Sequence, residues 1–168
     1  MWSTTASTLT LRLLVRWLLL AAWPLHLLVL LPLAVTESVA LLTAQPAVGD
    51  AALRLGAHYL CGAWLSFAVH ETGHAVALTQ GSGVARFTLI RTSWRFSVTT
   101  EEVLDEHRVI WVAVSSPGAA VAGGLLLWLV QPGWLLHGWY LTHALFLLPM
   151  FGDGRAALHG LTAMRRKP

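Results

Sequence analysis

Two histidines and a glutamate interrupt one of the most apolar stretches of this chain. The stretch runs from Tyr59 to Gln80, and its polar insertion reads His70-Glu71-Thr72-Gly73-His74. If the segment is helical, His70 and His74 lie one turn apart on the same face, so that two imidazole nitrogens can converge on one ion. The H-E-x-x-H spacing is typical of zinc hydrolases, in which the histidines bind the metal and the glutamate acts as a general base on water. The spacing therefore predicts His70 and His74 as zinc ligands and Glu71 as a catalytic residue.

Membrane depth makes a purely structural role for these side chains expensive. The chain has eight histidines, and chance produces the five-residue pattern in a chain of this composition at roughly the one per cent level. Each ionisable side chain in the bilayer costs about 2 kcal/mol or more unless it is partnered. A bound metal ion supplies such a partner, so we favour metal binding over packing alone.

Asp153 is the preferred third ligand of such a site. A catalytic zinc ion takes three protein ligands and leaves its fourth position for water or substrate. Asp153 lies between two glycines beside broken helix, where a carboxylate at membrane depth is a functional candidate. The alternatives are an acidic cluster and three histidines, namely Glu101, Glu102, Asp105, Glu106, His137, His143 and His159. Solvation at the start of a surface helix is the ordinary explanation for the acidic cluster.

The composition indicates a membrane protein. Of the 168 residues, 56% are hydrophobic and 11% are charged, whereas roughly 25% are charged in a soluble domain. The mean hydropathy is +0.64. The net charge of +3 comes from basic residues scattered beside apolar runs rather than gathered on one face, and this pattern argues against a nucleic-acid partner. The length fits one compact bundle in a lipid bilayer.

Four apolar runs are candidates for membrane spans, since about 20 helical residues cross the hydrocarbon core. They are Trp17–Val35, Tyr59–Gln80, Val109–Val130 and Trp134–Met150. The first run follows Arg12 and Arg16, as a cleaved signal peptide would, but it is longer than a signal core. We therefore expect an all-α membrane protein with about four transmembrane helices.

The remaining sequence predicts how these spans are connected. Residues 1–56 form an N-terminal transmembrane helix and an external loop, and residues 57–168 form a three-helix core. The polar residues at 36–56, among them Glu37, Asp50 and Arg54, predict a short connection whose second half can begin the next helix. Residues 84–100 alternate apolar and polar side chains, which predicts a short β-hairpin at the membrane surface between the second and third spans. This hairpin is either an ordinary connection or an edge to which an extended peptide adds as a strand. Thr99 and Glu102 fit a capping box, which predicts the start of the third helix.

The basic residues predict the orientation. If the spans alternate, both termini and the connection at 81–108 share one side of the membrane. That side then carries ten of the eleven basic residues and leaves Arg54 opposite. By the positive-inside rule, both termini are cytoplasmic in the cell membrane, and the motif and Asp153 lie toward the same side.

Across about residues 57–158 the chain resembles the site-2 protease family of intramembrane zinc metalloproteases. The family carries H-E-x-x-H in one transmembrane helix and, in a later one, a stretch of the form N-x-x-P followed by L-D-G. The later stretch here is Leu147-Leu148-Pro149-Met150-Phe151-Gly152-Asp153-Gly154. A block of small residues at 115–124, which predicts close packing against the motif helix, contains a Pro117-Gly118 pair similar to the Gly-Pro segment of the family's middle helix.

The resemblance implies hydrolysis of a peptide bond in a membrane-embedded protein substrate, with zinc held by His70, His74 and Asp153 and with Glu71 as the base. The chain departs from the family pattern in three places: Phe146 stands where the family has Asn, Gly152 where it has Leu, and Pro149 lies one residue closer to the aspartate. These departures leave a non-catalytic relative as an alternative. A membrane protein that uses His58, His143 and the motif histidines to bind haem or carry a metal is another. The sequence fixes no oligomeric state.

Overall fold

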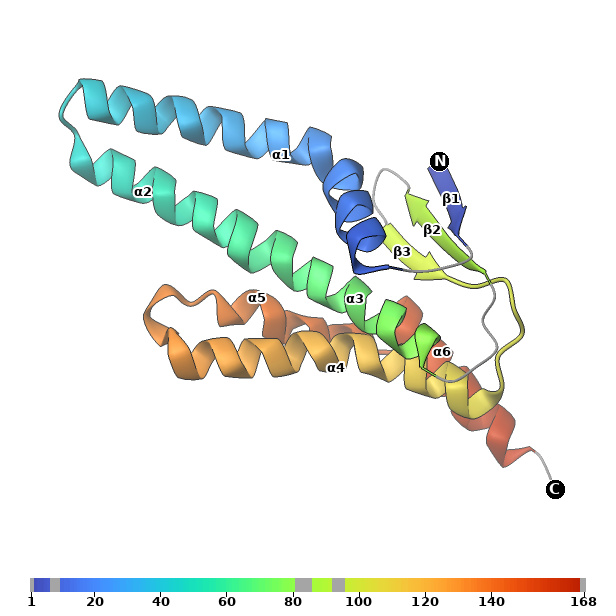
Figure 1. Cartoon of the computed structure of the whole chain (residues 1–168). Helices are drawn as coiled ribbons and strands as arrows, with labels where there is room; N and C mark the ends of the chain where they lie inside the picture. Colours follow the sequence, from blue (N-terminus) through green and yellow to red (C-terminus); the bar gives the residue numbers. More distant parts are fainter. Residues whose placement is uncertain (1, 7–9, 81–85, 92–95, 167–168) are drawn as a thin grey trace.

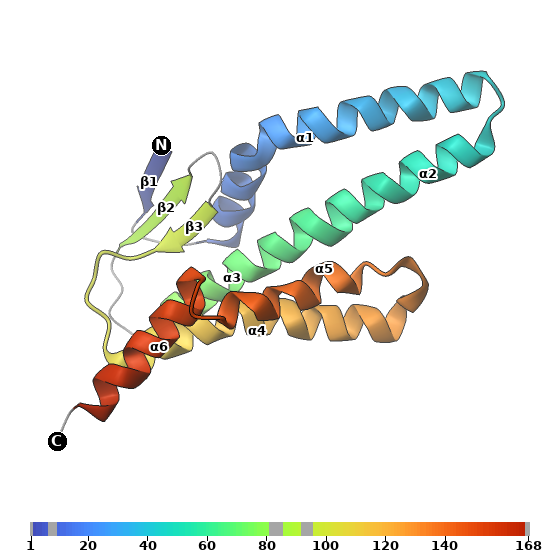
Figure 2. The same cartoon turned by 180° about the vertical axis from the view of Figure 1, so that it is seen from behind.

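The computed structural model describes residues 2–6, 10–80, 86–91 and 96–166, which form long helices and one small sheet (Figure 1). The sheet and both ends of the chain lie at one end of the molecule. The connections between α1 and α2 and between α4 and α5 lie at the other end (Figures 1 and 2). The chain therefore runs back and forth along one long axis.

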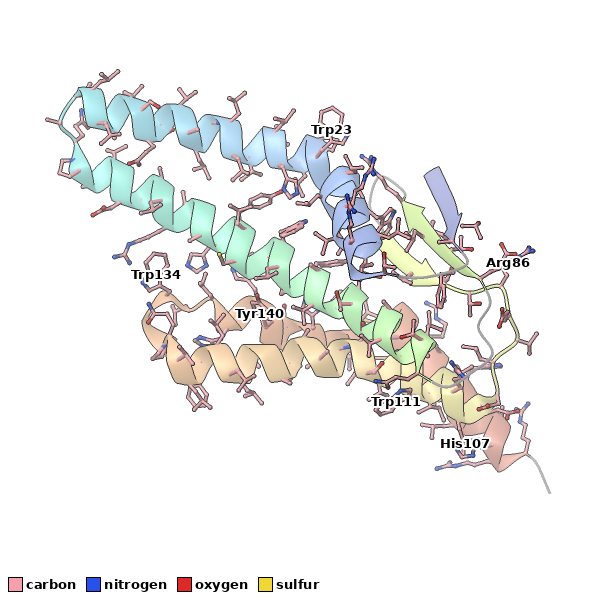
Figure 3. All side chains as sticks on the ribbon, in the orientation of Figure 1. Trp23, Arg86, His107, Trp111, Trp134 and Tyr140 are labelled. Carbon is pink, nitrogen blue, oxygen red and sulfur yellow. The ribbon has the colours of Figure 1, made fainter. Side chains whose placement is uncertain are left out.

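The helix α1 (Leu11–Leu42) begins at Thr10, whose side chain accepts a hydrogen bond from the Leu13 amide at 3.2 Å. It bends near Trp23, one residue before Pro24, where a proline ring removes a helical hydrogen bond and displaces the preceding turn (Figure 3). After a short turn at 43–45 the chain is helical again from α2 (Pro46–Ala57). The second half of the predicted connection at 36–56 is helical, as expected, and its first half is helical as well, because α1 continues to Leu42.

The motif lies on α3 (Leu65–Thr79), which follows α2 through a π-helical turn at His58–Trp64 without a break. A π-helical turn shifts the hydrogen bonds to i→i+5 and occurs frequently near functional sites. The Tyr140 hydroxyl donates to the Cys61 carbonyl in this turn at 2.9 Å. The predicted end of the motif helix near residue 81 agrees with the structure.

The helix α4 (Glu106–Val130) starts later than the capping box predicted. Its N-cap is Asp105, whose carboxylate accepts from the Arg108 amide at 2.8 Å. Thr99 is instead the last residue of a strand. The Arg108 guanidinium donates to the Leu78 carbonyl at 2.8 Å and so ties the start of α4 to the end of α3.

The fourth apolar run does not form one long helix. It comprises a 3₁₀ turn at Pro132–Trp134, the short helix α5 (His137–Leu141) and a 3₁₀ helix at Thr142–Leu147. Leu148 is extended, in keeping with the preference of a residue before proline for extended backbone, and α6 (Gly152–Arg165) begins after this interruption.

By length and composition, two helices among the described residues can cross a membrane, at Arg12–Leu42 and Glu106–Val130. The combined run of α2, the π-helical turn and α3 is also long, with 12, 7 and 15 residues in its three parts. The described residues are mostly helical. Two of the helices are long and apolar enough to cross a bilayer, and the strands form one small antiparallel sheet.

The sheet has the order β1-β2-β3 and is antiparallel throughout. β2 (Phe87–Arg91) and β3 (Phe96–Thr99) form the predicted hairpin, although residues 84–85 and 92–95 of that prediction lie outside the described residues. β1 (Trp2–Ala6) was not predicted, because five residues without a regular alternation carry no strand signal. It occupies the outer edge of β2, so the edge of β3 is the one that faces the helices.

A buried apolar cluster joins the start of α1, the sheet and α3. It includes Leu14, Trp17, Leu78, Leu89 and Val98. On the other side of α3, the predicted close packing against the small residues of α4 is present. An added Cβ at Gly73 would lie 2.7 Å from the Ser116 Cα, and the Ser116 hydroxyl donates to the His70 carbonyl.

This contact predicts that Gly73→Ala destabilises the protein. The new methyl group would meet backbone rather than a flexible side chain, and such overpacking costs about 1–3 kcal/mol. Gly118→Ala on α4 is the matched control, because nothing lies within 4 Å of its added Cβ. Thermal unfolding of the two variants in the same detergent should show a lower Tm for Gly73→Ala only, and equal Tm values would contradict the packing.

Candidate metal centre

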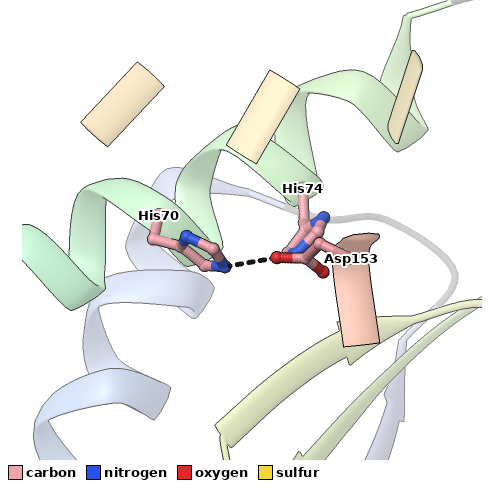
Figure 4. Close-up of side chains that lie close together, drawn as sticks. All are labelled: His70, His74 and Asp153. Atoms are coloured by element: carbon pink, nitrogen blue, oxygen red, sulfur yellow. Dashed lines mark ion pairs between the residues drawn. The ribbon is translucent and has the colours of Figure 1, made fainter. Parts of the chain in front are cut away.

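The three predicted ligands lie together. His70 and His74 project from successive turns of α3, and Asp153 projects toward them from the first turn of α6 (Figure 4). His70 Nε2 is 3.2 Å from Asp153 Oδ2, and His74 Nε2 is 3.3 Å from Asp153 Oδ1. One ligand atom from each residue lies within 4.8 Å of the others, so a single metal ion can contact all three.

Close backbone packing places Asp153. An added Cβ at Gly154 would overlap the carbonyl groups of Leu147 and Leu148, so the first turn of α6 lies directly against the turn that precedes it. Further along α6, an added Cβ at Gly160 would lie 2.7 Å from Ile110 Cγ1 on α4. Both α3 and α6 thus pack on α4, which sets the distance between the histidines and the aspartate.

The orientation of His74 is fixed by the backbone of α4. His74 Nδ1 lies 3.1 Å from the Val112 carbonyl oxygen. Because a carbonyl only accepts, Nδ1 carries the proton and Nε2 presents its lone pair toward Asp153. The hydrogen bond from Nδ1 to the backbone therefore leaves His74 Nε2 available as a ligand.

Aromatic side chains cover the His70 side of the centre. Phe146 lies 5.1 Å and Phe67 lies 6.0 Å from the His70 ring, centroid to centroid. His70 Nδ1 faces His143 Nδ1 at 3.0 Å. His70 itself is 3% exposed, so this side of the centre lies in an apolar environment.

The residues present fit a divalent cation. The lone pair of His74 Nε2 faces an anionic oxygen, an arrangement that is unfavourable unless a proton or a cation lies between the two atoms. Two imidazole nitrogens and a carboxylate oxygen form a common zinc ligand set, and three protein ligands leave a position for water or substrate.

Glu71 lies against the wall of the adjoining cavity. Its carboxylate is buried, and Oε2 accepts the Val98 amide of β3 at 3.1 Å. Val98 lines a cavity of about 340 Å³ together with His74 and Asp153. The predicted base is therefore held beside the cavity that His74 and Asp153 line.

The other candidates are not part of the three-residue group. Among the described residues, none of the alternative acidic residues or histidines joins the three-residue group. Asp105 caps α4, and His58 accepts from Trp139 Nε1 at 3.2 Å. Glu102 lines the same cavity as His74 and Asp153 without joining their group. His143, considered above as a third ligand, contacts His70 instead. Sequence spacing gave no signal for this contact or for the role of Val98.

No protein-family model, no curated protein and no solved structure matches the chain. The likeness to the site-2 protease family therefore rests on the motif residues alone.

The hydrogen bond from the Val98 amide to Glu71 predicts that this amide, on the edge strand β3, is protected against hydrogen exchange. Glu71→Ala should speed hydrogen exchange at the Val98 amide by roughly tenfold to a hundredfold, because a hydrogen bond to a charged acceptor is worth about 1.5–3 kcal/mol. The Leu89 amide is the internal control, since Leu89 faces Val98 in the register and its amide points to β1. Exchange that accelerates equally at both amides would instead indicate loss of the sheet.

Proposed function

We propose that this chain is an intramembrane zinc metalloprotease that hydrolyses a peptide bond of a membrane-embedded protein. The observation that carries the proposal is the convergence of His70, His74 and Asp153 beside a cavity against which Glu71 is held. This arrangement brings together two separate parts of the chain with the residue types that metal-dependent hydrolysis requires.

Each residue has a distinct role in the proposed reaction. His70, His74 and Asp153 hold the metal, and bound Zn²⁺ would polarise the scissile carbonyl and make water more acidic. Glu71 accepts the proton of the attacking water and delivers it to the leaving amine. The Val98 amide orients the Glu71 carboxylate for both transfers.

The cavity favours an extended substrate. Its walls include Ser97, Val98 and Thr99 of β3, and the Val98 amide points away from β2 toward Glu71. In an antiparallel strand the carbonyl of the same residue points the same way, so it can accept a hydrogen bond from a peptide backbone. A helical substrate hides its own carbonyls and must unwind locally to use this edge.

The shape of the molecule supports a four-span arrangement in the cell membrane with both termini cytoplasmic. The termini and the sheet share one end of the molecule (Figures 1 and 2), and alternation of the spans assigns ten of the eleven basic residues to that side of the membrane. Arg54 belongs to the opposite end, where its guanidinium lies 5.9 Å from the Trp134 ring. In this proposal the broken segment at 137–147 is the fourth span. One face of it packs on α4 through Tyr140 at Gly124, while Leu145 and Leu147 are exposed and would face lipid.

A non-catalytic metal-binding membrane protein is the second candidate. Phe146 favours it, because the side chain at the position of the family's Asn packs on His70 and has no hydrogen-bonding group. A haem protein would show a strong visible absorption band, whereas a zinc protein is colourless. Metal analysis and an absorption spectrum of the purified chain distinguish a haem protein from a zinc protein. Cleavage of co-expressed membrane substrates distinguishes the protease from a non-catalytic zinc protein.

The proposal predicts that Glu71→Gln lowers the rate of substrate cleavage by roughly 10²–10⁴-fold, the usual contribution of a general base. Zinc content should stay unchanged, because Glu71 is not a ligand. Cleavage of co-expressed membrane substrates measures the rate, with the exposed Glu101→Gln as the matched control. A fully active Glu71→Gln variant would remove Glu71 from the reaction.

Asp153→Ala should lose most of the bound zinc, because two imidazoles alone leave the ion with one ligand too few. Asp50→Ala, at an exposed position of α2, should keep the wild-type zinc content. Elemental analysis of both variants after equal exposure to a weak chelator measures the difference. Equal zinc contents would place the metal elsewhere or nowhere in the chain.

A further inference from the structure

Three buried polar side chains form a hydrogen-bonded series that leads away from the metal centre, from His70 through His143 to Ser66. His70 Nδ1 lies 3.0 Å from His143 Nδ1, and His143 Nε2 lies 3.3 Å from Ser66 Oγ. We propose that His143 and Ser66 are positioning residues that fix the tautomer of His70, so that its Nε2 is available to the metal. The inference rests on the proposed metal site but not on proteolysis.

Ser66 sets the direction of the hydrogen bonds. Its hydroxyl donates to the Ala63 carbonyl at 2.9 Å. A hydroxyl has one proton, so toward His143 the Ser66 oxygen can only accept. His143 Nε2 must therefore carry the ring proton, and a neutral His143 has a bare Nδ1.

The same logic fixes His70. Because His143 Nδ1 is bare, it accepts the proton on His70 Nδ1. His70 Nε2 is then left without a proton, and this is the atom that faces Asp153 at 3.2 Å. Ser66, three residues from Ala63 and four from His70 on the same helical run, thereby controls which nitrogen of His70 can bind a metal.

Packing holds His143 in this role. His143 and Ser66 are 3% and 2% exposed, so water cannot replace either partner. The His143 ring stacks on Phe146, with centroids 5.2 Å apart and planes 21° apart, and its edge meets Phe67 at 5.6 Å. A flipped ring would place carbon atoms opposite both His70 and Ser66, and both hydrogen bonds would be lost.

The two histidine ligands therefore differ in how they are oriented. His74 donates to the Val112 carbonyl, which is an acceptor by its nature. His70 donates to an imidazole, which accepts only while Ser66 keeps the His143 proton on the far nitrogen. Loss of the Ser66 hydroxyl should consequently loosen His70 and leave His74 as it is.

Zinc titration of the full chain in detergent tests the inference, with the metal itself as the probe. His143→Leu should weaken Zn²⁺ binding by roughly 10- to 100-fold, the usual loss for an outer-sphere partner of a histidine ligand. His143→Asn keeps an acceptor near the Nδ1 position and should bind within about threefold of wild type, well short of that loss. Ser66→Ala should be intermediate. His137→Leu, on the same helical segment, is the matched control and should have no effect.

A second readout separates positioning from folding. The ¹⁵N shifts of the His70 ring in the metal-free chain, assigned by their absence in His70→Ala, should show the proton on Nδ1 in wild type. They should move toward the other tautomer in Ser66→Ala and His143→Leu. Ser66→Ala removes a single hydroxyl, so this comparison stands even if His143→Leu fails to fold.

The outcomes are distinct. Wild-type affinity and an unchanged tautomer in Ser66→Ala would overturn the inference while the proposed metal site stands. So would a His143→Asn variant that binds as weakly as His143→Leu, since ring shape rather than the acceptor would then matter. A wild-type chain that binds no Zn²⁺ would overturn the proposed function itself, together with any role of His143 toward a metal.

Discussion

The contact between α3 and α4 at Gly73 and Ser116 is the constraint on which the centre depends. Here two helix backbones touch without a side chain between them, and the Ser116 hydroxyl bonds the His70 carbonyl. The motif turn is thereby fixed relative to α4, and the same helix supplies the Val112 carbonyl for His74. Because α6 also packs on α4 through Gly160, one helix carries the alignment of all three ligands.

The sequence predicted the three metal ligands, because each can be recognised from its immediate sequence neighbours. The spacing of His70 and His74 follows from helical periodicity, and Asp153 follows from the cost of a carboxylate at membrane depth. The contacts Ser66–His143, Val98–Glu71 and His143–His70 could not be predicted, because their partners lie 77, 27 and 73 residues apart in the chain. Only tertiary packing brings such residues together.

The predicted boundaries of the helices were wrong where polar residues lie inside helices. Glu37 suggested that the first helix ends earlier, but it lies on α1, which continues to Leu42. Asp50 and Arg54 lie on α2, in the half of the connection where a helix was expected. The carboxylate of Glu37 lies against Gly49, where the missing side chain leaves room for it between the two helices. The fourth run was the reverse case, because its apolar composition suggested one span while Pro149 interrupts the helix.

The strand β1 has a consequence for how the molecule is made. Thr4 pairs with Leu89, so β1 leaves the ribosome early but has no partner until the motif helix and β2 have followed. During translation β1 therefore remains unpaired while α1, α2 and α3 are synthesised. The sheet can therefore form only after β2 has been made. Its formation joins the segment before α1 to the segment after α3.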